Sequence, residues 1–84
     1  MAHADPSPTP NPDALKFTLD IQLPAMLNAA GPAEATDAFT GAVFAAPGVA
    51  NVFGVNDFVT VTRTPGADWD PIVEAVQAAA AAHL

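Results

Sequence analysis

The sequence predicts an α+β sandwich of order β-β-α-β-β-α, in which two helices cover one face of a four-stranded antiparallel sheet. Three patterns carry this prediction. Apolar and polar residues alternate over 15–23, as in a half-buried strand. Two β-branched and aromatic runs, 49–55 and 58–63, flank a two-residue turn of the hairpin type. A helical apolar stripe runs through 69–80. At 84 residues the chain has room for one such domain.

The N-terminal segment is predicted to be an extended, partly disordered arm over residues 1–10, followed by a single domain over 11–84. Prolines occupy positions 6, 8, 10 and 12, where they remove backbone donors and favour extended geometry. The first strand follows over 15–23 and turns five apolar side chains toward the core: Leu15, Phe17, Leu19, Ile21 and Leu23.

A short second strand is predicted around 26–30, returning beside the first strand, with a short helix after it. Thr36 or Asp37 can accept a hydrogen bond from the free amides at the start of that helix. The helix ends at Pro47-Gly48, and Gly48 is expected to supply a backbone conformation that other residues reach only with strain.

The turn at Asn56-Asp57 sets the register of the predicted hairpin and places Val55 opposite Phe58. Side chains alternate between the two faces of a strand. The face predicted to meet the helices carries Val52, Val59 and Val61, and the other carries Phe53, Val55 and Phe58. The second set is either an exposed apolar surface for a partner or a second layer of the core, and the sequence leaves both alternatives open.

The last helix is predicted to begin at Asp68 or Asp70, either of which can cap it, with Pro71 tolerated in its first turn. Its buried stripe is predicted to contain Trp69, Ile72, Val73, Val76 and Ala80.

Composition excludes several classes of function. The sequence has no cysteine, so the chain forms no disulfide, no thiolate metal site and no thiol nucleophile. Nine acidic residues against Lys16 and Arg63 give a net charge of -7, which argues against binding to nucleic acid or to an anionic membrane surface. The sequence starts without a signal-peptide pattern. We therefore expect a soluble cytoplasmic protein, and a monomer rather than an oligomer.

The residues show no catalytic constellation. Ser7 is the only serine, and His3 and His83 lie near the two ends of the sequence, which does not favour a nucleophilic triad. Asp68 and Asp70 are better explained by the positive end of the last helix than by acid–base chemistry. We expect no catalytic residue, no metal ligand and no cofactor, and we predict that the protein is not an enzyme.

Four short motifs occur along the sequence in a defined order and at defined spacings. Thr9-Pro10-Asn11-Pro12 leads into Leu15-Lys16-Phe17, Gly48 opens a G-V-x-x-V-F stretch, Asp57 opens the stretch D-F-V-T-V-T, and Trp69 follows Asp68. Together they resemble the N-terminal domain of the Nfu/NifU scaffold family over residues 9–84. The resemblance implies this fold and a link to iron–sulfur cluster assembly. In that family the cluster is held by a C-x-x-C pair of a second domain, which has no counterpart here.

The first motif also has a structural interpretation. Prolines 10 and 12 stiffen the approach to the first strand, and Asn11 and Asp13 can close a turn from side chain to backbone. Lys16 and Arg63 are either solvated charges, or one of them orients this turn or an acidic partner.

The function predicted from these observations is a non-catalytic interaction module that assists iron–sulfur cluster assembly or delivery without binding the cluster itself. Its partners would be scaffold, carrier or client proteins that carry the cysteine ligands of the cluster. The alternative is a domain that binds a small ligand or a divalent metal through loop carboxylates, namely Asp13, Asp57, Asp68 and Asp70.

Overall fold

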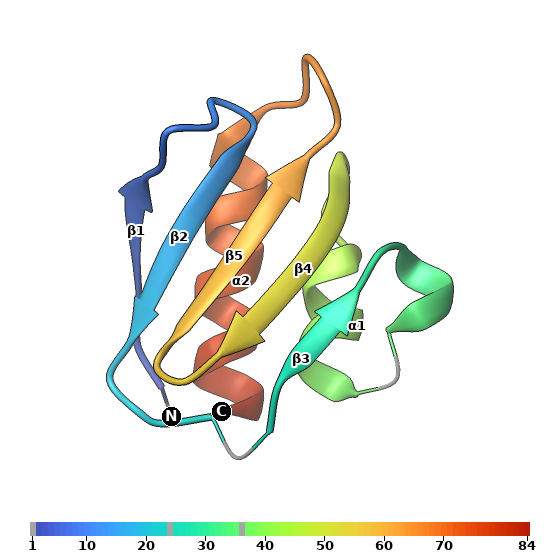
Figure 1. The fold of residues 1–84 in the computed structure, drawn as a ribbon. Coiled ribbons are helices and arrows are strands. Elements are labelled where there is room, and N and C mark those ends of the chain that lie inside the picture. The colour runs from blue at the N-terminus through green and yellow to red at the C-terminus, as the bar shows by residue number, and fades with distance from the viewer. Residues whose placement is uncertain (1, 24, 36) are drawn as a thin grey trace.

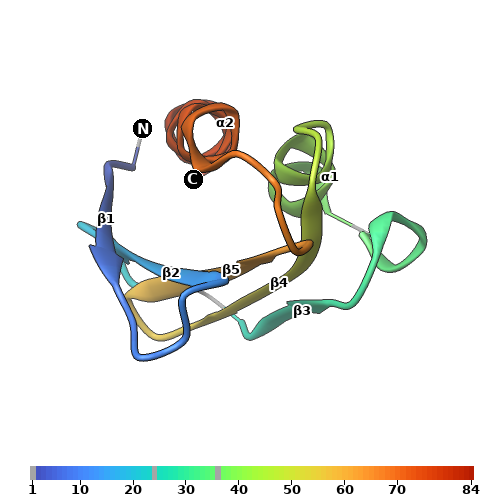
Figure 2. The ribbon, with the colours of Figure 1, turned by 90° about the horizontal axis from the view of Figure 1, so that it is seen from above.

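Two layers make up the fold, a five-stranded antiparallel sheet and a pair of α-helices on one of its faces (Figures 1 and 2). The computed structural model describes residues 2–23, 25–35 and 37–84. The strand order across the sheet is β1-β2-β5-β4-β3. In chain order, the elements are β1 (Ala4–Pro8), β2 (Ala14–Leu19), β3 (Leu27–Ala29), the 3-10 helix η1 (Pro32–Glu34), α1 (Ala38–Phe44), β4 (Val49–Val55), β5 (Phe58–Arg63) and α2 (Trp69–His83).

The prediction of four strands was wrong, because part of the segment predicted to be an arm forms the fifth. Strand β1 pairs antiparallel with β2, with Ala4 opposite Leu19 and Pro8 opposite Leu15. The proline spacing, which suggested an arm, is compatible with an edge strand. A proline can occupy a strand when its missing N–H would point away from the neighbouring strand.

Hydrogen bonds on the free side of β1 show which residues point outward. The Ala2 N–H donates to the Ala80 carbonyl at 3.3 Å, and the Ala4 carbonyl accepts from Gln77 Nε2 at 3.2 Å. The N–H and C=O groups of every second residue point to the same side of a strand, so the backbone groups of Pro6 and Pro8, like those of Ala2 and Ala4, point away from β2. The prolines therefore cost the sheet no hydrogen bond, and they leave few donors at this edge for another strand to use.

Strand β2 ends earlier than predicted, because the chain turns toward the β4–β5 hairpin after Leu19. The Leu19 N–H donates to the Asp57 carbonyl at 2.7 Å, and the Leu23 N–H donates to the Asn56 carbonyl at 2.6 Å. Leu23 is nevertheless buried, as the alternation predicted. The second predicted strand is present as the short strand β3, but its predicted place beside the first strand was wrong: β3 pairs with β4 at the other edge of the sheet, because β1 and β5 occupy the two sides of β2.

The β4–β5 hairpin has the predicted register. Val55 lies opposite Phe58 and Val52 opposite Val61. Asn56 makes the turn possible with a φ of 56°, a left-handed conformation that asparagine tolerates better than most residues. The three valines predicted to face the helices are fully buried: Val52, Val59 and Val61.

Both helices are capped by aspartates. The Asp37 side chain accepts a hydrogen bond from the Thr40 N–H at 2.9 Å, and the Asp68 side chain accepts one from the Asp70 N–H at 3.2 Å. Thr36, the other predicted cap of the first helix, lies outside the described residues. A side-chain cap satisfies one of the free amides at the start of a helix.

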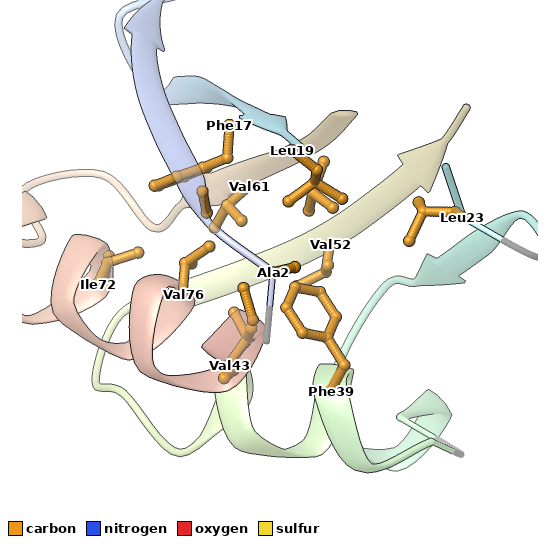
Figure 3. Packing of buried hydrophobic residues seen from close by; sticks show 14 residues of the cluster. Ala2, Phe17, Leu19, Leu23, Phe39, Val43, Val52, Val61, Ile72 and Val76 are labelled. Carbon is orange, nitrogen blue, oxygen red and sulfur yellow. The ribbon is translucent and has the colours of Figure 1, made fainter. Parts of the chain in front are cut away.

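The hydrophobic core lies between the sheet and the helices, where side chains from both layers meet (Figure 3). Phe17 is fully buried on the sheet side, and Ile72 and Val76 are fully buried on the α2 side. Trp69 and Val73, predicted in the same helical stripe, are partly buried against this core. In the part of the chain that the structure describes, no helix covers the opposite face of the sheet (Figure 2).

Candidate functional site

The sheet face opposite the helices, here called the outer face, carries the residues that the sequence analysis singled out for a partner. Phe53 and Val55 project from β4 and Phe58 from β5, on the face opposite the buried valines. Val55 and Phe58 are direct cross-strand neighbours, and Phe53 pairs with Thr60. We call Phe53, Val55 and Phe58 the outer apolar cluster. All three side chains are partly buried.

Lys16 joins this cluster from the neighbouring strand β2. Its Nζ lies 4.6 Å from the centre of the Phe58 ring, a distance at which a cation is attracted to the face of an aromatic ring. The register places Lys16 beside Thr60 of β5 and Ser7 of β1. The outer face therefore presents apolar side chains and a positive charge together, in a chain whose net charge is -7.

The loop between β1 and β2 is closed by the side chains of Thr9 and Asn11. The Thr9 hydroxyl accepts from the Asn11 N–H at 3.2 Å and lies within donating distance of the Asn11 and Ala14 carbonyl oxygens, at 2.9 and 3.0 Å. Asn11 Oδ1 accepts from the Asp13 N–H at 3.0 Å, which confirms the predicted turn from side chain to backbone. Pro10 and Pro12 lie in this exposed loop.

Arg63 holds this loop against the start of α2, so one of the two cations does orient the Asn11–Asp13 turn. Its backbone N–H donates to the Asp13 carbonyl at 2.8 Å, and its Nε donates to Asp13 Oδ1 at 3.2 Å. Its Nη1 donates to the Ala67 carbonyl at 2.8 Å, and its guanidinium carbon lies 5.3 Å from the centre of the Trp69 ring. These contacts tie together two loops and a helix start, which is a structural role.

We expect Arg63→Lys to lower the free energy of unfolding by about 1–2 kcal/mol. A lysine cannot keep the two directed hydrogen bonds and the flat contact with Trp69 that the guanidinium makes. Urea unfolding followed by circular dichroism measures the change. The control is Lys16→Arg, because Lys16 is exposed and should tolerate the exchange. Equal stabilities of the two variants would contradict the role given to Arg63.

The four carboxylates of the alternative prediction do not meet in one place. Asp13 is paired with Arg63 at one end of β5, whereas Asp57 occupies the hairpin turn at the other end of that strand. Asp68 caps α2, and Asp70 lies in its first turn. Within residues 2–23, 25–35 and 37–84, no three histidine, aspartate or glutamate residues gather as a metal site would require.

The two histidines do not belong to a metal-binding group among the described residues. His3 Nε2 lies 3.8 Å from Asp5 Oδ1, and both side chains are largely exposed. His83 lies in the last turn of α2.

Among the described helices, none combines the length and the apolar character that a membrane crossing needs.

Sequence reasoning missed two features near the predicted residues. Asp5 and Ser7 belong to the outer face, and their position depends on the pairing of β1, which the alternating prolines could have indicated. The contact of Lys16 with Phe58 depends on the pairing of β2 with β5, and no local pattern reports a pairing between segments so far apart.

Comparisons with known proteins agree on the family and the fold. The family model described as "Scaffold protein Nfu/NifU N terminal" matches residues 5–84. The crystal structure of protein SAV1430 from Staphylococcus aureus is 25% identical with a TM-score of 0.77, and the match covers 92% of this chain and 96% of that one. The solution structure of SAV1430 is 26% identical with a TM-score of 0.68, covering 88% and 84%.

A further solved structure shows a similar fold. The solution structure of SeR13 from Staphylococcus epidermidis is 22% identical with a TM-score of 0.61, and the match covers 94% of each chain. No curated protein gives a significant match to the sequence.

Proposed function

This chain belongs to the scaffold protein Nfu/NifU N-terminal family, and on that premise we propose that it is a non-catalytic interaction module in iron–sulfur cluster assembly or delivery. The observation that carries the proposal is the outer face, where the outer apolar cluster lies beside Lys16 on a sheet face that none of the described helices covers. Membership of the family supports a role in iron–sulfur cluster assembly. The open sheet face offers a surface on which a protein can dock.

The cluster itself is cargo held by the partner in this proposal. Protein ligands of iron–sulfur clusters are in most cases cysteine thiolates, and the sequence has no cysteine. The described acidic and histidine side chains form no group of three that could replace them. The contribution of this chain is therefore recognition and positioning of a protein that carries the cysteines.

The charges of this chain indicate the chemical character of the surface with which a partner would bind the outer face. The outer apolar cluster favours an apolar contact, and Lys16 favours a carboxylate close to that contact. The net charge of -7 favours a partner with basic residues around the contact, because opposite potentials speed encounter. We propose that the partner surface has an apolar centre with a carboxylate and a basic rim. The cytoplasmic location and the monomeric state of the protein remain predictions.

Affinity capture from cell extract, compared between wild type and Phe53→Thr, tests this function. Threonine suits a strand beside Thr60 and removes the aromatic ring from the outer face. We expect wild type to enrich iron–sulfur scaffolds, carriers or client enzymes, and we expect Phe53→Thr to lose them while its circular dichroism spectrum stays native.

The matched control is Glu74→Gln, which changes an exposed residue on α2, on the opposite side of the molecule. It should capture the same proteins as wild type. A set of captured proteins without any iron–sulfur protein would contradict the pathway. Undiminished capture by Phe53→Thr would contradict the docking surface.

A further inference from the structure

A cavity of about 240 Å³ opens between the start of α1, the end of α2 and the segment before β3. Among the described residues, its apolar lining includes Leu23, Leu27, Ala38, Phe39 and Leu84. Leu23 and Phe39 belong to the hydrophobic core, so the floor of the cavity is continuous with that core (Figure 3). The cavity lies on the helix side of the sheet and shares no residue with the outer apolar cluster.

The size of the cavity limits what it can hold. Sites for cofactors and drug-sized ligands usually measure roughly 300–1,000 Å³, more than this cavity offers. A cavity of about 150 Å³ already accommodates a benzene molecule. A volume of about 240 Å³ therefore fits a single large apolar side chain and excludes most cofactors.

The polar groups around the cavity select the charge of its occupant. The exposed carboxylate of Asp37 lies on its lining, together with His83 in the last turn of α2. The C-terminal end of a helix of 15 residues carries a partial negative charge, which favours a cation nearby. The opposing positive end at this cavity belongs to α1, a helix of only seven residues, and the carboxylate of Asp37 caps it. Neither Lys16 nor Arg63 lines the cavity. The net charge of -7 adds a field of the same sign.

We propose that this cavity binds a large apolar side chain that is followed by a lysine or arginine in a segment of a protein partner. The apolar side chain enters between Leu23, Leu27 and Phe39, and the neighbouring cation lies against Asp37 and the end of α2. This site goes beyond the proposed function, because it uses the opposite side of the sheet from the outer apolar cluster.

An amide-shift titration with short peptides tests the proposal directly. The probe is N-acetyl-leucyl-arginine amide, compared with N-acetyl-leucyl-glutamate amide and N-acetyl-glycyl-arginine amide. We expect saturable shifts in ¹H–¹⁵N spectra at Leu27, Ala38, Phe39 and Leu84, with affinity in the millimolar range. The two comparison peptides should each bind about fivefold more weakly or worse.

Two variants separate the apolar contact from the charge. Ala38→Leu extends an exposed side chain of the lining and should weaken binding by about tenfold or more. Asp37→Asn keeps a good helix cap and removes the charge, so binding should weaken about two- to fivefold. Asp5→Asn, which makes the same change of net charge on the outer face, should bind like wild type.

Several results would overturn the proposal. They are the lack of saturable shifts at the lining residues, equal affinities for the arginine and glutamate peptides, or full affinity in Ala38→Leu. The Phe53→Thr variant keeps the cavity and should bind the peptide normally, so a failure of this site is distinguishable from a failure of the outer face.

Discussion

Phe17→Ala is expected to lower the free energy of unfolding by about 3–5 kcal/mol. Phe17 is fully buried in β2, with Pro6 and Val59 as its neighbours on the adjacent strands. Removing the ring loses its transfer free energy and leaves a cavity under α2. Domains of this kind have about 5–15 kcal/mol of stability in total, so the variant should be close to unfolding at room temperature. Urea unfolding followed by circular dichroism measures the change.

The control for Phe17 is Phe53→Ala, which removes the same ring from the outer face. Phe53 is only partly buried and lies on the sheet face that none of the described helices covers, so we expect a loss of about 1–2 kcal/mol and no enclosed cavity. The pair tests the assignment of the two sheet faces. Equal losses for Phe17→Ala and Phe53→Ala would contradict that assignment.

Gly48→Ala is expected to cost about 2–5 kcal/mol, for two reasons that add. Gly48 joins α1 to β4 with a φ of +86°, which a residue with a side chain adopts only at a cost. A Cβ at this position would also collide with the Cβ of Ala67 in the loop before α2. That loop is fixed by the hydrogen bond from Arg63 Nη1 to the Ala67 carbonyl, so it cannot move away freely.

The matched variant for Gly48 is Gly66→Ala. Gly66 has a similar φ of +82°, but apart from Gly66 itself and its two chain neighbours no residue has an atom within 4 Å of the position that its Cβ would take. Only the backbone cost should remain, about 1–2 kcal/mol. The difference between the two thermal or urea midpoints then measures the collision with Ala67. A Gly48→Ala variant as stable as Gly66→Ala would show that the loop relaxes at little cost.

Local patterns were sufficient to predict the hairpin, both helices and the valine face of the core. In each case the determining residues lie close together in the sequence, as with Asn56 in the turn and the aspartates at the helix starts. The N-terminal strand was not predicted, because a segment with a proline at every second position forms a strand only beside a partner such as β2.

The candidate site was predicted in part. The outer apolar cluster follows from the hairpin register, which is local. The contact of Lys16 with Phe58 and the pairing of Arg63 with Asp13 join residues that are far apart in the sequence, 50 positions for the second pair. The cavity beside Asp37 is assembled from α1, α2 and the segment before β3, so no single stretch of sequence could reveal it.

The central claim is that the outer face docks an iron–sulfur protein, and amide-shift mapping with a captured partner tests it most directly. We predict that adding the partner shifts or broadens the amide signals of Lys16, Phe53, Val55, Phe58 and Thr60, and leaves those of exposed α2 residues such as Glu74 and Ala78 in place. Changes confined to the helices, with the signals of β4 and β5 unmoved, would contradict the claim.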